Sequence, residues 1–257
     1  MSGTVHCSRP LEHVMLLEID NPPRNTLGRA MREQMRGHLH AADADFTVRA
    51  VVVSGRGKAF CSGDDLREEL EALGERGSRG GNLLDFASLL EQVEQLRVPV
   101  VAAIGGWCVG GGVELALCCD VRIASTQARF VCAGVNVGLM ASAYRLPRLI
   151  GLGPARHLLL TGSPADVAWA RACGLVTAVH ADDELAGEAL VIAARIASRA
   201  PLSVEASKRV SGLALDLDPE KGREAQGREL ATLLQSSDHV EAVRAFLEKR
   251  DPKFTRS

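Results

Sequence analysis

Residues 104–120 read Ile-Gly-Gly-Trp-Cys-Val-Gly-Gly-Gly-Val-Glu-Leu-Ala-Leu-Cys-Cys-Asp, and this stretch decides the fold. The apolar run 98–104 predicts a buried strand, and the residues from Val113 onward predict a buried helix. Three glycines, 110–112, therefore stand where a helix begins. Free N–H groups at a helix start carry the positive end of the helix dipole, and glycine leaves them open to a ligand. The pattern predicts a site for a negative oxygen, with the Glu114 carboxylate beside it for proton transfer.

The composition limits the class of protein. The chain has 257 residues, 46% of them hydrophobic, which suffices for one large core with an appendage. A formal net charge of -2 favours neither nucleic acid nor a membrane surface as a partner. We find no membrane-spanning run and no signal peptide, and therefore expect a cytoplasmic protein. The seven cysteines form no C-x-x-C pair and the histidines no H-E-x-x-H, which predicts reduced, mostly buried thiols and no metal site.

Strands alternate with helices along most of the chain. Runs rich in Val, Leu and Ile, bounded by turn-forming residues, predict strands at 13–20, 49–54, 98–104 and 120–124. Helical spacing at 28–42 and 86–96 then indicates a layered α/β core. Residues 65–81 begin as a charged helix and change to Gly, Ser and Arg, which makes them a candidate mobile lid. From residue 186 onward, helical patterns broken near two prolines predict a helical appendage.

Common nucleotide and hydrolase motifs are missing. The segment Gly-Arg-Gly-Lys at 55–58 lacks the spacing of a phosphate-binding loop, and the glycine run lacks the offsets of G-x-G-x-x-G. The chain also has no G-x-S-x-G nucleophile turn. These absences argue against a dehydrogenase of the Rossmann type and against a serine hydrolase. Without further context, Glu114 could equally be a carboxylate that only stabilises the helix start.

A second strand-to-helix turn changes that balance. Residues 58–66 read Lys-Ala-Phe-Cys-Ser-Gly-Asp-Asp-Leu, and together with the glycine run they resemble the crotonase family, the enoyl-CoA hydratase/isomerase superfamily. The resemblance spans nearly the whole chain and continues at 21–27, 158–162, 172–176 and 246–254. It implies an α/β fold, a crotonase-like spiral of ββα units with a C-terminal helical extension. We expect the acyl-CoA-binding core at 1–195 and the extension, used for oligomerisation, at 196–257.

The resemblance also implies an active site. In the family, each of the two turns donates one backbone N–H to a thioester carbonyl, and these donors correspond here to Asp64 and Gly111. Glu114 matches the first of two hydratase glutamates. The second, about twenty residues downstream, corresponds to Gly134, which has no carboxylate. The following loop, 138–146, is shorter than usual for the family and lacks its paired glycines.

Three hypotheses could account for the missing glutamate. Glu114 could act alone with an ordered water, or Tyr144 or the Asp64 side chain could replace the second acid, or the reaction could differ. The simpler expectation for Tyr144, the only tyrosine, is that its side chain fills space in the fold. For Asp64, we expect a carboxylate that points away from the thioester oxygen. The preferred activity is hydration of a 2-enoyl-CoA to a 3-hydroxyacyl-CoA. The alternatives are isomerisation or another enolate-type reaction of acyl-CoA, and a catalytically impaired acyl-CoA-binding member of the family.

The resemblance further implies how an acyl-CoA thioester is held. The implied substrate-binding residues are Ala59, Ser62, Asp64, Leu66, Gly110, Gly111 and Gly134, with Arg24 as the candidate phosphate contact. Lys249 and Phe254 match a C-terminal segment that often reaches the ligand of a neighbouring subunit. The family packs as trimers, often paired into hexamers, so we expect a homotrimer or a dimer of trimers. No cofactor is expected, because coenzyme A is part of the substrate.

Overall fold

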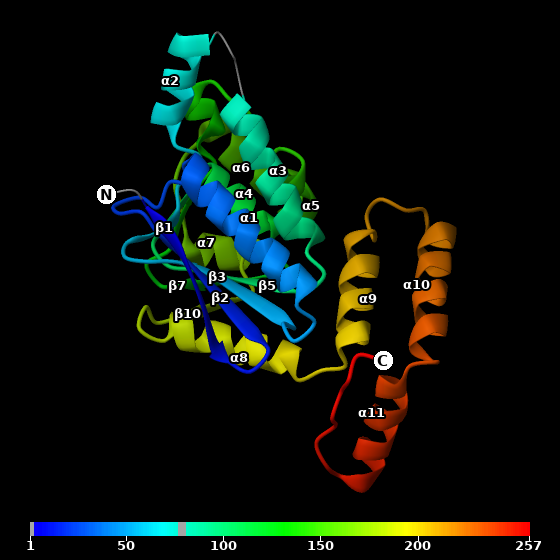
Figure 1. Cartoon of the computed structure of the whole chain (residues 1–257). Coiled ribbons are helices and arrows are strands. Elements are labelled where there is room, and N and C mark those ends of the chain that lie inside the picture. The colour runs from blue at the N-terminus through cyan, green and yellow to red at the C-terminus, as the bar shows by residue number, and fades with distance from the viewer. Residues whose placement is uncertain (1–2, 77–80) are drawn as a thin grey trace.

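A six-stranded sheet runs through the centre of the computed structural model, which describes residues 3–76 and 81–257 (Figure 1). Its strands lie in the order β1-β2-β3-β5-β7-β10, and all neighbours are parallel except β1 and β2. The bounds are β1 Thr4–Leu11, β2 Val14–Asp20, β3 Ala50–Gly55, β5 Val100–Ile104, β7 Val121–Ser125 and β10 Ala178–His180. The four strands predicted from the sequence correspond to β2, β3, β5 and β7.

A second sheet of four short strands has the order β4-β6-β8-β9. These strands are β4 Ala59–Cys61, β6 Trp107–Val109, β8 Arg129–Val131 and β9 Ala165–Asp166. The chain alternates between the sheets, because β3 is followed by β4, β5 by β6 and β7 by β8. This alternation is the expected spiral of ββα units. The sequence prediction missed the second sheet, since strands of two or three residues show no periodicity.

Helices follow each pair of strands. After β4 come α2 (Leu66–Arg76) and α3 (Gly81–Gln95), and after β6 comes α4 (Gly111–Cys118). After β8 come the 3₁₀ helix η1 (Ala133–Val137), α5 (Arg145–Ile150) and α6 (Leu152–Thr161), with α7 (Val167–Ala172) after β9. The candidate lid at 65–81 contains α2 and the first residue of α3, while 77–80 lie outside the described residues. Of the described helices, none is long and apolar enough to cross a membrane.

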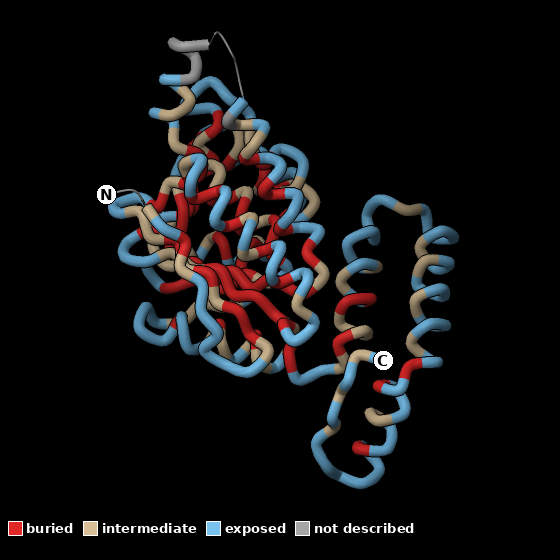
Figure 2. Tube along the Cα trace, viewed as in Figure 1, coloured by how far each residue is buried: buried red, intermediate tan, exposed pale blue. Residues whose placement is uncertain are grey.

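The strand alternation divides the apolar side chains between two faces of the large sheet. Val51 and Val53 of β3 join the main core cluster, on the face that α1 (Arg29–Ala44), α3 and α4 cover. Ala50 and Val52 face the other way, toward α8 (Leu185–Ala197). Figure 2 shows the buried residues concentrated in this sheet and in the helices over it. Because both faces are covered, the strands are continuous apolar runs instead of alternating ones.

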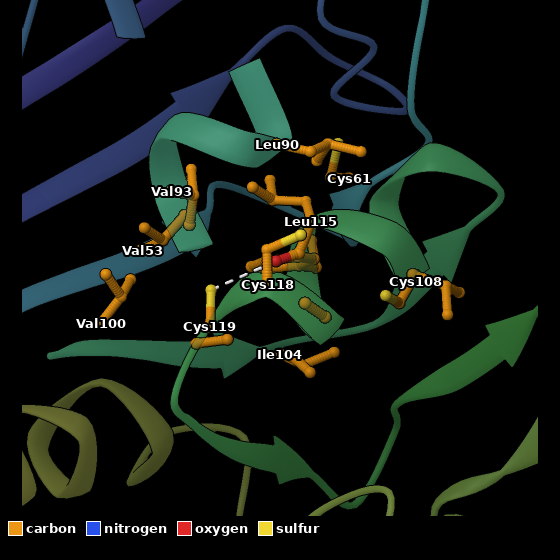
Figure 3. Packing of buried hydrophobic residues seen from close by; sticks show 14 of the residues in the cluster. Val53, Cys61, Leu90, Val93, Val100, Ile104, Cys108, Leu115, Cys118 and Cys119 are labelled. Atoms are coloured by element: carbon orange, nitrogen blue, oxygen red, sulfur yellow. Dashed lines mark hydrogen bonds between the residues drawn. The ribbon is translucent and has the colours of Figure 1, made fainter. Parts of the chain in front are cut away.

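Cysteines fill part of the core beside α4 (Figure 3). Cys61, Cys108, Cys118, Cys119 and Cys132 are buried, whereas Cys7 is exposed and Cys173 is partly buried. Burial raises the pKa of the Cys61 thiol to about 12, so this thiol stays neutral near pH 7. The expected buried, reduced thiols are therefore present at five of the seven positions.

The C-terminal segment consists of α9 (Pro201–Gly212), α10 (Pro219–Leu233) and α11 (Ser237–Glu248), which stand off from the core (Figure 1). Pro201 and Pro219 begin α9 and α10, where proline costs nothing because its missing N–H has no helical partner. The boundary expected between residues 195 and 196 falls within the last turn of α8, which ends at Ala197.

Candidate active site

The two strand-to-helix turns touch each other. Gly63 follows β4 with a φ of +82°, and a Cβ built there would lie 2.6 Å from the Gly111 nitrogen. Gly110, with a φ of +52°, directs the chain from β6 into α4, which begins at Gly111. The N–H of Gly111 therefore belongs to the first helical turn, where no intrahelical partner exists. Only glycine at position 63 permits this approach, because any side chain would displace the second turn.

Residues 21–27 form hydrogen bonds that hold β4 and the turn at Gly63 in place. The Leu27 N–H donates to the Gly63 carbonyl at 2.8 Å, and Leu27 forms a parallel bridge with Asp64. Asn25 is buried with a φ of 54°, and its side-chain nitrogen donates to the carbonyls of Ala59 and Arg56 at 2.6 and 2.9 Å. The segment thus fixes β4 and the turn that follows it.

The Asp64 carboxylate contacts α1. Its Oδ1 accepts a hydrogen bond from Arg32 Nη1, and both side chains are buried. Burial raises the pKa of Asp64 to about 6, although the Arg32 charge lowers it. Arg32 thus holds the Asp64 side chain against α1, and the position of this carboxylate relative to a bound ligand stays a prediction.

Glu114 stands in the first turn of α4, half-buried. Its Oε1 accepts a hydrogen bond from the Ser142 N–H at 2.6 Å. Ser142 is buried and has a φ of 60°, which is unusual for a residue with a side chain. One oxygen of the Glu114 carboxylate is therefore fixed by the loop between η1 and α5.

This loop also closes the position of the missing second glutamate. The Leu139 N–H donates to the Gly134 carbonyl at 2.8 Å, which folds the loop back over η1. A Cβ built on Gly134 would lie 2.9 Å from both the Ala141 nitrogen and the Leu139 carbonyl oxygen. Position 134 is thus closed to a side chain as the loop is folded, and Ser142 of the same loop contacts Glu114 instead.

Comparison with known proteins agrees with this geometry. Residues 11–257 match the family model of enoyl-CoA hydratase/isomerase. The chain belongs to the enoyl-CoA hydratase/isomerase family. A 2,3-dehydroadipyl-CoA hydratase of Escherichia coli (strain K12) is 33% identical over 249 residues, and a crotonyl-CoA hydratase of Syntrophomonas wolfei is 32% identical over 254 residues. Each alignment covers 95% of this chain and 95% of the relative.

A solved structure of the same family shows the same fold. The crystal structure of an enoyl-CoA hydratase from Bacillus anthracis superimposes with a TM-score of 0.94 at 31% sequence identity. The match covers 98% of this chain and 99% of that chain. The crotonase-type α/β fold expected from the sequence is therefore confirmed, as is membership of this enzyme family.

Tyr144 was a candidate for the second acid of this family site. Its side chain is 66% exposed, and its hydroxyl donates to Asp216 Oδ1 at 3.2 Å. The Arg148 guanidinium lies over its ring, 4.9 Å from the centroid. The contacts that the structure gives Tyr144 thus tie α5 to the connection between α9 and α10, and they do not involve Glu114.

The other expected substrate contacts divide into two groups. Ala59 lies in β4, and Ser62 lies in the turn that follows it. Leu66 is the first residue of α2 and is half-exposed. Arg24 is exposed, next to the buried Asn25. These four residues belong to segments that adjoin the Gly63 turn. Lys249 instead caps the C-terminal end of α11, and Phe254 lies in the tail that follows it. The Phe254 carbonyl accepts from Arg49 at 2.9 Å, at the edge of the core.

Sequence reasoning missed three residues that shape the site. Asn25 belongs to residues 21–27, but a left-handed backbone cannot be read from the sequence of that segment. Arg32 and Ser142 act on Asp64 and Glu114 from 32 and 28 residues away along the chain. Within the described residues, no group of histidine, cysteine or acidic side chains could hold a metal ion.

Proposed function

We propose that this protein adds water to a 2-enoyl-CoA thioester and produces the 3-hydroxyacyl-CoA. The observation that carries the proposal is the contact between the turns of Gly63 and Gly111, with Glu114 in the same helical turn as Gly111. The hydratase names of the relatives described above support it. In this proposal the N–H groups of Asp64 and Gly111 hold the thioester oxygen.

The chemistry follows from where charge develops. As water oxygen bonds to C3, the π electrons move to the thioester oxygen, and two fixed N–H donors stabilise that enolate by about 3–4 kcal/mol each. Glu114 takes one proton from the water as its oxygen attacks. The same carboxyl group then returns a proton to C2 and becomes a carboxylate again. With position 134 closed to a side chain, Glu114 performs both transfers.

The test is the loss of the conjugated thioester absorbance when crotonyl-CoA is added. Glu114→Gln should lower kcat by about 10²–10⁴-fold, because the amide cannot accept the proton. Glu224→Gln, on an exposed face of α10, is the matched control and should keep the wild-type rate. A wild-type enzyme that leaves 2-enoyl thioesters unchanged, or full activity of Glu114→Gln, would contradict the proposal.

Isomerisation of a 3-enoyl-CoA is the second candidate, and one observation favours it. A single carboxylate can move a proton from C2 to C4, and Glu114 is a carboxylate beside Gly111, while the loop closes the place of Gly134. Product analysis with 3-enoyl and 2-enoyl thioesters in parallel separates the two activities. Binding of both thioesters without turnover would instead identify a catalytically impaired member.

The proposal extends to assembly and coenzyme A binding. We propose a homotrimer or a dimer of trimers that uses the C-terminal helices, where Lys249 and Phe254 would meet the ligand of a neighbouring copy. Support comes from exposed apolar side chains on α11, Val240, Val243, Phe246 and Leu247. Arg24 is the proposed phosphate contact, and the buried reduced thiols suit a cytoplasmic location.

A further inference from the structure

A buried arginine stands behind the proposed oxyanion hole. Arg32 of α1 has a side chain with 0% exposure. Its Nη1 donates to Asp64 Oδ1 and, at 2.9 Å, to the Leu27 carbonyl, while its Nε donates to Asp85 Oδ2 at 2.7 Å. Its Nη2 has no hydrogen-bond partner among the described residues and lies 4.0 Å from Glu68 Oε2. Such a buried cation is costly unless it is paired, so its place requires an explanation.

The guanidinium contacts the first turn directly and the second turn only through a neighbouring residue of α3. It binds the side chain of Asp64 directly, and the Asp64 N–H is the first donor of the proposed oxyanion hole. It also binds Asp85, the neighbour of Phe86 on α3. A Cβ built on Gly111 would lie 2.7 Å from the Phe86 ring, so this ring packs against Gly111, the second donor of the proposed hole. One side chain thus connects the supports of the two N–H donors.

The charge of Asp64 makes this connection important. A bare carboxylate on the residue that donates the N–H would repel the negative charge that develops on the thioester oxygen. The other Asp64 oxygen, Oδ2, is buried without a hydrogen-bond partner, and the facing groups on α2 and α3, Glu68 and Asp85, are acidic. Arg32 is the cation that pairs with the Asp64 carboxylate.

We propose that Arg32 is a positioning residue of the oxyanion hole, which cancels the Asp64 charge so that the hole can accept an enolate oxygen. The inference rests on the proposed acyl-CoA chemistry, but it concerns a residue that does not touch the substrate. It requires Arg32 to matter more for a negatively charged thioester oxygen than for a neutral one. A merely structural arginine would affect both alike.

Two thioesters measure this difference. Acetoacetyl-CoA can bind as its enolate, whereas butyryl-CoA keeps a neutral carbonyl, and calorimetry gives both affinities without turnover. Arg32→Met should weaken acetoacetyl-CoA binding by about 10²-fold and butyryl-CoA binding by less than about threefold. It should also abolish the enolate absorbance of bound acetoacetyl-CoA, and lower kcat for crotonyl-CoA with little change in KM.

Three further variants complete the design. Arg32→Met combined with Asp64→Ala removes both charges, and should recover at least about tenfold of the lost enolate affinity. Arg32→Gln keeps hydrogen bonding without charge, so it should show the same selective loss even if Arg32→Met does not fold. Arg97→Met is the matched control, because Arg97 forms a largely buried ion pair with Glu205 of α9. It should leave the ratio of the two affinities unchanged.

The expected results distinguish a failure of the Arg32 role from a failure of the proposed activity. Equal losses on both thioesters, wild-type selectivity in Arg32→Gln, or no recovery in the double variant would each overturn the role of Arg32. The rate at which the wild-type protein hydrates crotonyl-CoA tests the proposed function independently of Arg32. If wild type binds the enolate but does not hydrate crotonyl-CoA, the proposed activity fails while the inference on Arg32 stands.

Discussion

The approach of the two turns at the proposed oxyanion hole depends on single glycines, above all on Gly63. Its φ of +82° disfavours a side chain, and a Cβ there would lie 2.6 Å from the Gly111 nitrogen. Gly63→Ala should therefore push the two turns apart and lower kcat for crotonyl-CoA by about 10²–10³-fold. Steady-state kinetics provide the measurement.

Gly57→Ala is the control for backbone strain alone. Gly57 has a similar φ of +78°, but no heavy atom lies within 4 Å of a Cβ built there. This variant should lose some stability and keep kcat. Equal kinetic losses in both variants would show that strain, and not the contact between the turns, causes the effect.

The Asp64 carboxyl predicts a pH dependence of stability. Burial raises its folded pKa from 3.8 to about 6, so the folded protein binds a proton that the unfolded chain has already lost between these values. The contribution of Asp64 to stability is therefore complete below pH 3.8 and is lost as the pH rises to about 6. Denaturant unfolding between pH 4 and 7 should show wild type losing stability relative to Asp64→Asn over this range. A constant difference between the two proteins would contradict the raised pKa.

At the scale of elements, the loop between η1 and α5 distinguishes this chain from the two-glutamate pattern of its family. Gly134→Glu would restore the carboxylate, but its Cβ would lie 2.9 Å from two backbone atoms of the loop. Overpacking of this kind costs about 1–3 kcal/mol, and each kcal/mol lowers the melting temperature by about 2–4 °C. We expect this loss in thermal unfolding, and no gain in hydration of crotonyl-CoA.

Gly153→Glu provides the comparison, since Gly153 lies exposed on α6 with no heavy atom within 4 Å of a Cβ. It makes the same change in charge and should not lower the melting temperature. Faster hydration by Gly134→Glu at unchanged stability would mean that the loop moves aside readily, and that the closed position has no functional meaning.

Across the whole molecule, ion pairs anchor the C-terminal segment to the core near both ends of α9. Arg97 pairs with Glu205 at 2.6 Å, and Arg148 pairs with Asp216 at 2.9 Å. Arg256 pairs with the buried Glu205 at 2.9 Å, and the buried Asp238 accepts from the Thr255 and Arg256 N–H groups. The chain end is thereby tied to α9 and α11. On α11, Phe246 is 82% and Leu247 74% exposed. Exposed apolar clusters of this kind mark contact surfaces.

The proposed assembly can be tested on this surface. Phe246→Glu should reduce the molar mass measured by light scattering from that of a trimer or hexamer toward that of one chain, because a charge would be buried in the interface. Glu12→Lys, in the exposed turn between β1 and β2, makes a charge change away from the C-terminal helices and should leave the mass unchanged. A wild-type mass of one chain would contradict the proposed oligomer.

Local sequence patterns predicted part of the large sheet and, with the family resemblance, named the candidate site residues. Strands β2, β3, β5 and β7 and the start of α4 follow from local apolar runs and from glycines that only a turn requires. Glu114 and the two N–H positions were identified from the same local patterns together with the family resemblance. Such features depend on neighbours within a few residues, which a linear pattern contains.

The surroundings of those residues follow from the packing of segments that are distant in the chain. The pairing of Asp64 with Arg32, the N–H of Ser142 on Glu114 and the closed space at Gly134 each join segments far apart in the chain. The short strands of the second sheet likewise exist only because neighbouring turns of the spiral pair with them. These contacts depend on distances between packed elements, and the local sequence does not contain those distances because burial and charge pairing are set by the fold as a whole.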